Sequence, residues 1–250
     1  MTDFRLKRPE KWDLAYTFDK GNKDLCVLYL HGWLANRHRQ KGLIARDVAL
    51  ASGCSYLSLD YTAHGESGGN PPDFTIGQGI EDTLQVIQEN IKDIPLIIIG
   101  NSVGGWIGLW LAEHLRQVVG FVGLAPAPDI TDWIWKKMLP SYAKVAIKAG
   151  NILGPNKETY GFCFTKQLFD DGEKHFMLTR PIDFKGPVRI LWGDQDERVE
   201  KSCIDDIKNR LISDDVIINI IKGANHHLSS ERDLKILADV LKMIIRDVQE

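Results

Sequence analysis

The chain has 250 residues, which is enough to bury a sizeable core in one large domain or two small ones. Its composition is that of an ordinary soluble globular protein, with 44% hydrophobic residues, 26% charged residues and a net charge of −3. The negative balance and the lack of a Lys/Arg block argue against nucleic-acid binding. No apolar run reaches the ~18 residues that a membrane span needs.

Targeting signals and cysteine spacing bear on the compartment. Residues 1–9 contain no apolar segment of signal-peptide length, so we expect a cytoplasmic protein. The four cysteines show neither a CxxC spacing nor a paired histidine pattern, so we expect reduced thiols and no metal site. These cysteines are Cys26, Cys54, Cys163 and Cys203.

Six apolar runs, typical of buried β-strands, follow one another along the chain. They are residues 25–30, 55–59, 96–99, 118–125, 188–192 and 216–221. Near-continuous apolar strands are those that are covered on both faces, as in a parallel sheet. Helical patterns alternate with them, at residues 43–51, 75–91, 106–115, 201–211 and after Ser229-Ser230. The alternation predicts an α/β fold with a mostly parallel, doubly wound sheet.

One segment, residues 129–185, breaks this alternation because it contains no strand pattern of comparable strength. It is rich in aromatic residues, including Trp133 and Trp135. A segment this long between strands often carries function, although packing alone would account for many of its aromatics. We expect a core formed by residues 1–128 and 186–250, an inserted helical cap at 129–185, and substrate contacts at Trp133 and Trp135.

The most informative motif joins the strand at 96–99 to the helix at 106–115. It reads Gly100-Asn-Ser102-Val-Gly104 and matches G-x-S-x-G, the pattern of a nucleophile elbow. In such an elbow a sharp turn lifts the serine hydroxyl above the sheet, and glycines remove side chains that would collide there. By itself the pattern also fits an ordinary turn in which the serine caps the helix, so the assignment depends on finding its partners.

A nucleophilic serine needs a base, and the base needs an acid that orients it. In an α/β sheet these groups gather at the carboxyl ends of the strands. Two carboxylates follow the fifth predicted strand: Asp194 has the position of a turn residue, whereas Asp196 lies at the loop apex. His226 and His227 follow the sixth strand. Ser102, one of these aspartates and one of these histidines therefore follow one another in the order serine, aspartate, histidine.

Two backbone N–H groups must face the negative charge that develops on the substrate oxygen. Val103, which follows the nucleophile, would supply one. We expect the other from the loop after the first predicted strand, His31-Gly32-Trp33, where the glycine allows a sharp turn and the Trp33 amide follows. We interpret His31 as a residue that braces this loop.

With these motifs in place the chain resembles the α/β-hydrolase family over nearly its full length. The matching segments are His31-Gly32, residues 60–67, the elbow, residues 193–199 and residues 223–226. The resemblance implies that the 60–67 loop and its His64 are structural, and that His226, the fourth residue of its motif, is the base rather than His227. The chain departs from the family pattern at Thr62, Ala63 and Glu200.

A further likeness lies in residues 166–175, 179–182, 187–191 and 104–106. These segments resemble the branch of that family made up of mitochondrial acyl-protein thioesterases and acyl-glucuronide esterases. The resemblance implies a serine esterase or thioesterase that acts on acyl groups. The mitochondrial location is not carried over, because no presequence is obvious.

The expected function is hydrolysis of a small-molecule carboxylic ester or thioester with an apolar acyl group, through an acyl-serine intermediate. Ser102 attacks, His226 accepts its proton and Asp196 orients the imidazole, while the Trp33 and Val103 amides hold the oxyanion. No cofactor and no metal are required. A peptidase or amidase of the same fold and a non-catalytic ligand-binding homologue are the alternatives. The sequence does not indicate the oligomeric state.

Overall fold

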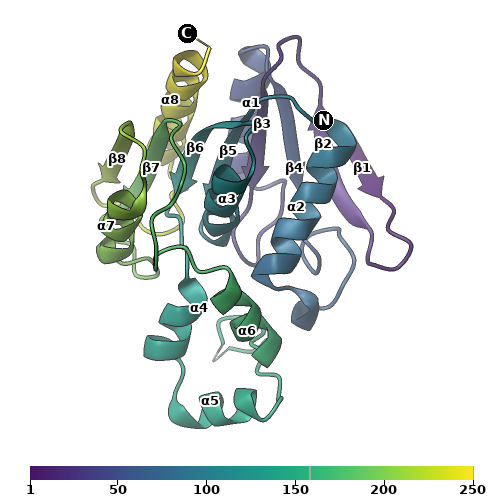
Figure 1. Ribbon diagram of the computed structural model, residues 1–250, viewed down its shortest axis with the longest axis vertical. Helices are drawn as coiled ribbons and strands as arrows, with labels where there is room; N and C mark the ends of the chain where they lie inside the picture. Colours follow the sequence, from purple (N-terminus) through teal and green to yellow (C-terminus); the bar gives the residue numbers. More distant parts are fainter. Residues whose placement is uncertain (158, 250) are drawn as a thin grey trace.

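A single eight-stranded sheet runs through the molecule in the order β1-β2-β4-β3-β5-β6-β7-β8 (Figure 1). The computed structural model describes residues 1–157 and 159–249. The strands are β1 (Asp3–Leu6), β2 (Leu14–Asp19), β3 (Cys26–Leu30), β4 (Ser55–Leu59), β5 (Leu96–Asn101), β6 (Val118–Leu124), β7 (Val188–Gly193) and β8 (Val216–Ile221). Every pairing from β4 to β8 is parallel, whereas β1 and β2 pair antiparallel. The predicted α/β class and mostly parallel sheet are confirmed.

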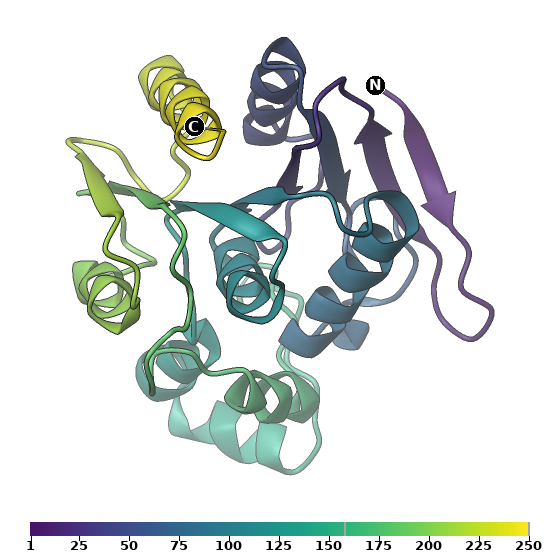
Figure 2. The ribbon, with the colours of Figure 1, turned by 45° about the horizontal axis from the view of Figure 1, so that its top comes forward.

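Helices cover both faces of the sheet, with α1 and α8 on one side and α2, α3 and α7 on the other (Figure 2). Their bounds are α1 (Gln40–Ala51), α2 (Ile76–Asn90), α3 (Val103–His114), α7 (Lys201–Arg210) and α8 (Glu231–Asp247), with a short 3-10 turn η1 (Pro71–Asp73) before α2. Local signals fix two of the starts. Thr75 Oγ1 accepts a hydrogen bond from the Gln78 amide, and Ser230 and Asp233 form a reciprocal capping box.

The two ends of the sheet differ from the sequence expectation. β1 and β2 are absent from the six predicted strands. β1 is a short, exposed edge strand with no continuous apolar run, whereas β2 is mostly buried but interrupts its apolar residues with Thr17. β8 was expected to be buried on both faces, but it is the opposite edge strand, and Ile217 and Ile220 are exposed. An edge strand has a neighbour on one side only, so an apolar run there does not imply full burial.

The segment between β6 and β7 forms a helical layer beside one end of the sheet (Figure 1). It contains α4 (Ile130–Trp133), a π-helical turn η2 (Ile134–Met138), α5 (Ser141–Lys148) and α6 (Lys166–Lys174). Six of its buried side chains form an apolar cluster apart from the main core, namely Ile134, Leu139, Ala143, Ile147, Phe164 and Leu168. We call this layer the cap.

The cap is tied to the core where the chain enters and leaves it. The Asp129 carboxylate accepts hydrogen bonds from the amides of Met177 (2.8 Å) and Leu178 (2.9 Å), which joins the two connections. Met177, Ile182 and Phe184 pack in the main core. The separately packed part of the insertion is therefore narrower than residues 129–185.

In the described part of the chain no helix combines the length and the apolar character that crossing a bilayer requires.

The central strand β5 is buried in the main core. Ile98→Ala in β5 is expected to lower the free energy of unfolding by about 2–5 kcal/mol, because the fully buried side chain would leave a cavity. Ile220→Ala on β8 is the matched control and should cost less than about 1 kcal/mol, since half of that side chain is exposed. Urea unfolding of both variants measures the difference. Equal losses would contradict this account of the core.

Candidate active site

Ser102 lies in the tight turn between β5 and α3. Its backbone has φ +53° and ψ −119°, a conformation that non-glycine residues rarely adopt. A Cβ atom on Gly100 would lie 2.5 Å from the Gly104 carbonyl oxygen, and one on Gly104 would lie 2.4 Å from the Leu30 carbonyl oxygen. Glycine is therefore needed at both positions because strand and helix approach each other so closely. This is the geometry of a nucleophile elbow.

The structure brings three of the predicted site residues together. His226 Nε2 lies 3.1 Å from Ser102 Oγ, and His226 Nδ1 lies 2.8 Å from Asp196 Oδ2. The other oxygen of the fully buried Asp196 carboxylate accepts hydrogen bonds from the amides of Arg198 (2.8 Å) and Val199 (2.9 Å). With its Nδ1–H donated to aspartate, the imidazole presents the lone pair of Nε2 to the serine hydroxyl.

Asp194 and His227, the other candidates for the acid and the base, do not face Ser102. Asp194 Oδ1 accepts a hydrogen bond from the Gly223 amide (2.6 Å) and so joins the acid loop to the histidine loop. His227 is exposed, and partial desolvation is the largest cause that lowers the pKa of its imidazole. Its carbonyl oxygen accepts a hydrogen bond from Lys41 Nζ on α1. Burial lowers the pKa of Lys41 to about 8.

The loop after β3 lies against the nucleophile. A Cβ atom on Gly32 would be 3.3 Å from Ser102 Cβ and 2.6 Å from Asn101 Nδ2. Within residues 1–157 and 159–249, neither the Trp33 amide nor the Val103 amide donates a hydrogen bond to another protein group. Val103 is also the first residue of α3, where the helix dipole favours negative charge. Both amides are therefore free to hold an oxyanion.

Two other histidines near this loop are buried. His31 is fully buried and its Nδ1 lies 2.8 Å from the Gly32 carbonyl oxygen, which braces the loop. Burial is the main cause that lowers the pKa of His31 to about 3, so the ring is neutral at physiological pH. His64 is also buried, and its Nδ1 lies 3.1 Å from the Thr62 carbonyl oxygen.

An aromatic cluster joins the oxyanion loop to the cap. The Trp33 ring lies 5.9 Å from the Phe74 ring on the core side, and 4.7 Å and 6.3 Å from the rings of Phe162 and Phe164 on the cap side. Sequence reasoning did not single out Phe74 or Phe162, because neither lies in a motif. Their signal is positional: Phe74 precedes α2, and Phe162 lies in the aromatic-rich insertion.

The two tryptophans predicted to contact substrate lie in different surroundings. Trp133 Nε1 donates to Glu200 Oε1 (3.0 Å), and the ring lines a cavity of about 300 Å³. Ala127 and Val199 line the same cavity, and their amides donate to the Ser102 carbonyl oxygen and the Asp196 carboxylate. Trp135 instead packs edge-on against Phe169, with ring centroids 4.9 Å apart, and belongs to the packing of the cap.

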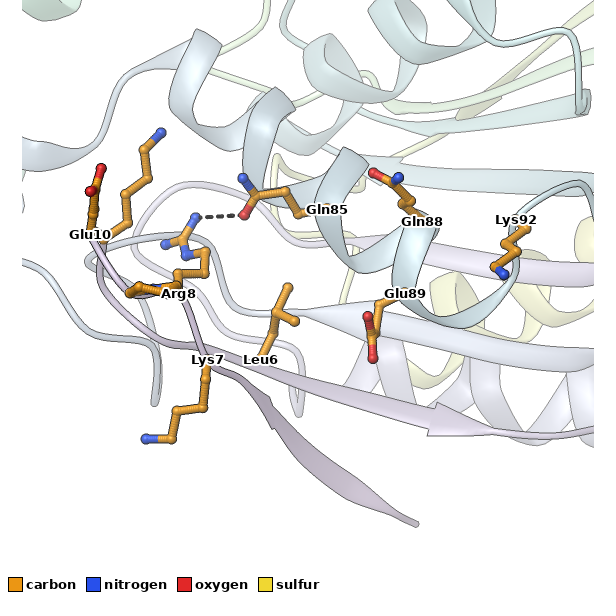
Figure 3. Close-up of a pocket in the computed structure, with 10 residues that line it drawn as sticks. Leu6, Lys7, Arg8, Glu10, Gln85, Gln88, Glu89 and Lys92 are labelled. Carbon is orange, nitrogen blue, oxygen red and sulfur yellow. Dashed lines mark hydrogen bonds between the residues drawn. The ribbon is translucent and has the colours of Figure 1, made fainter.

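A second cavity, of about 760 Å³, lies between α2 and the segment after β1 (Figure 3). Most of the residues that line it are charged or polar, Gln85 and Glu89 among them. Arg8 Nη1 already donates to Asp82 (2.7 Å) and Gln85 (3.2 Å), so its charge is paired within the protein. None of the predicted site residues lines this cavity, and we assign it no role in the reaction.

Comparison with known proteins places the chain in a family. A model of the alpha/beta hydrolase family matches residues 27–228, and the chain belongs to that family. In sequence it is similar to the bovine protein "Palmitoyl-protein thioesterase ABHD10, mitochondrial", with 29% identity over 246 residues that cover 96% of this chain and 79% of the relative. The family resemblance expected from the motifs is confirmed.

Solved structures show the same likeness. Mouse alpha/beta hydrolase domain-containing protein 10 superposes with a TM-score of 0.86 at 26% identity, covering 99% of this chain and 100% of that one. Est1E from Butyrivibrio proteoclasticus, solved with ferulic acid bound, gives a TM-score of 0.81 at 18% identity, with 98% of each chain covered. At that lower identity the likeness shows the shared fold alone.

The geometry distinguishes the two histidines of the last loop. His226→Ala is expected to lower kcat for a soluble aryl ester by about 10³-fold or more, because it removes the group that faces Ser102 Oγ. His227→Ala should change kcat only a few-fold, since that side chain is exposed. Steady-state kinetics on both variants, with circular dichroism as a folding control, make the comparison. Equal losses would leave the assignment of the base unsupported.

Proposed function

We propose that this protein is a serine hydrolase that cleaves a carboxylic ester or thioester bearing an apolar acyl group, through an acyl-serine intermediate. The observation that carries the proposal is the hydrogen-bonded series from Ser102 Oγ through His226 to the buried Asp196 carboxylate. Membership of the alpha/beta hydrolase family supports it. A serine of ordinary acidity becomes a nucleophile only beside such an oriented base.

Acylation uses the residues as follows. Ser102 Oγ attacks the carbonyl carbon while His226 Nε2 takes the hydroxyl proton, and Asp196 stabilises the imidazolium. The amides of Trp33 and Val103 hold the oxyanion of the tetrahedral intermediate. When the intermediate collapses, the bond to the leaving oxygen or sulfur breaks, and His226 gives its proton to that atom. The alcohol or thiol departs and the acyl group remains on Ser102.

Deacylation repeats the sequence with water. His226 Nε2 takes a proton from water as its oxygen attacks the acyl carbonyl, and the same two amides hold the second oxyanion. Collapse releases the carboxylic acid and returns the proton to Ser102 Oγ. The cycle consumes one water and balances without a metal, a cofactor or a redox partner.

The apolar acyl preference rests on the surroundings of the oxyanion loop. Trp33 supplies both an amide for the oxyanion and a ring packed with Phe74 and Phe162, so an acyl chain would leave the carbonyl along an aromatic wall. The bovine relative is named as a palmitoyl-protein thioesterase, which supports an acyl thioester among the substrates. The cavity beside Trp133 is the proposed place for the remainder of the substrate.

The peptidase alternative would gain from a free cap carboxylate that could hold a substrate amine. The acidic candidates on α6 are Asp170, Asp171 and Glu173; Glu173 is exposed, whereas the other two are engaged elsewhere. Asp170 is paired with Lys166 on the same helix, and Asp171 accepts a hydrogen bond from the Gly77 amide (2.7 Å). These contacts weaken the case for Asp170 and Asp171 as ligands of a substrate amine. The cytoplasmic location stays a prediction, which microscopy of a tagged chain can test.

Loss of the nucleophile should abolish the chemistry. Ser102→Ala is expected to reduce hydrolysis of aryl esters and of an acyl thioester to near the background rate, and to prevent labelling by a fluorophosphonate probe. Labelling followed on a gel and hydrolysis followed by absorbance give independent readouts. Ser67→Ala is a matched control and should still label. A Ser102→Ala variant that labels and hydrolyses like the parent would refute the serine-hydrolase mechanism.

Acyl preference should depend on the Trp33 ring rather than its amide. Trp33→Ala keeps the backbone N–H but removes the aromatic wall. The ratio of kcat/KM for long-chain p-nitrophenyl esters to kcat/KM for p-nitrophenyl acetate should therefore fall by about ten-fold, which is equivalent to about 1.4 kcal/mol. Trp12→Ala, at an exposed tryptophan, is the control and should leave the chain-length profile unchanged. If the parent profile is flat from acetate to long chains, the proposed acyl site is wrong.

A further inference from the structure

Helix α5 presents an apolar surface to solvent. Its inward face is buried through Ala143 and Ile147, which belong to the cap cluster. A surface helix usually carries polar residues on the opposite face. In α5 that face instead has Val145 near its centre, with Tyr142 beside it one turn back, and the two side chains are 68% and 69% exposed.

The same part of the chain is strongly cationic. Residues 133–157 contain five lysines and no aspartate or glutamate, in a chain whose net charge is −3. Lys136 and Lys137 pair with Asp132 and Glu200 at the base of the cap. Lys148 is exposed on α5, where its Nζ also lies 5.7 Å from the Trp135 ring centroid, and Lys144 is half-buried beside it. Positive charge therefore flanks the exposed Val145.

More exposed apolar groups lie in the chain that follows α5. Ile152 is 54% exposed and Tyr160 is 69% exposed. Gly161, next to Tyr160, approaches the oxyanion loop so closely that a Cβ atom there would lie 3.3 Å from Leu34 Cδ1. Leu34 is itself half exposed and follows Trp33. Exposed apolar side chains thus occur from α5 to the loop that carries the proposed oxyanion amide.

We propose that the outward face of α5 is a docking surface for an anionic lipid bilayer. Exposed aromatic and aliphatic side chains among lysines are the chemistry of an interfacial segment, in which the apolar groups enter the headgroup region and the lysines contact anionic lipids. α5 lies at the end of the long axis of the molecule, far from the sheet, so a flat surface can reach it (Figure 1). A membrane-bound acyl substrate would then be presented on the cap side.

Charge favours a lipid surface over a second copy of the chain. A symmetric dimer through this face would place α5 against its own equivalent. Lysines of both copies would then face each other with no acidic residue from 133–157 to compensate, and such like-charge contacts are unfavourable. An anionic bilayer supplies the opposite charge along the whole face. The inference goes beyond the proposed reaction, because docking does not require catalysis.

Vesicle co-sedimentation tests the proposal. The full chain is mixed with vesicles of phosphatidylcholine alone, or of phosphatidylcholine with phosphatidylglycerol. We expect it to sediment with the second kind and to be released as salt is raised. Lys144→Gln with Lys148→Gln should weaken binding about five-fold for each lysine. Tyr142→Ser with Val145→Ser should also weaken it, whereas Ile217→Ser with Ile220→Ser, at exposed isoleucines on β8, should not.

Other readouts separate docking from catalysis and from self-association. Hydrolysis of soluble p-nitrophenyl acetate should be unchanged in both α5 variants, and Ser102→Ala should bind vesicles like the parent. Failure of the parent to bind phosphatidylglycerol vesicles would overturn the proposal while leaving the reaction intact. Light scattering could instead show that the parent is a dimer and that Tyr142→Ser with Val145→Ser is a monomer. That result would make this face a contact between copies and would also overturn the proposal.

Discussion

β5 and α3 approach each other closely at Ser102, and this contact positions the rest of the site. Only glycine fits at 100 and 104, and between them Ser102 has a positive φ of 53°. The same contact brings Gly104 against the carbonyl of Leu30, the last residue of β3. The loop that follows β3 is thereby held beside the nucleophile. One steric requirement thus positions the serine hydroxyl and both amides proposed for the oxyanion.

The acid and base are positioned by the order of the strands. β7 and β8 are parallel neighbours, so the loops at their carboxyl ends lie side by side. A Cβ atom on Gly193 would lie 2.2 Å from the Ala224 carbonyl oxygen, and Asp194 bonds the Gly223 amide. These contacts hold the two loops together, which leaves Asp196 and His226 at hydrogen-bond distance. The buried aspartate is satisfied by two amides and the imidazole, so its orientation is fixed.

The sequence predicts those parts of the fold and of the candidate site that local sequence patterns determine. Continuous apolar runs locate the parallel strands, and the order of motifs locates Ser102, Asp196 and His226 because each follows a strand end. β1 has no apolar run and gives no such signal. Cap contacts depend on how the insertion folds onto the core. For that reason the similar residues Trp133 and Trp135 have different surroundings. The contact between Trp33 and Phe74 and the exposure of Val145 could not be predicted from the sequence for the same reason.

Mass spectrometry of a quenched reaction can show whether the acyl group passes through Ser102 Oγ. The parent enzyme would be mixed with a long-chain p-nitrophenyl ester, quenched in acid during the first turnover, digested and mapped. We expect one acylated peptide, with the acyl mass on Ser102. Acylation of another residue, or turnover with no acyl-enzyme while p-nitrophenol is released in a burst, would contradict this expectation.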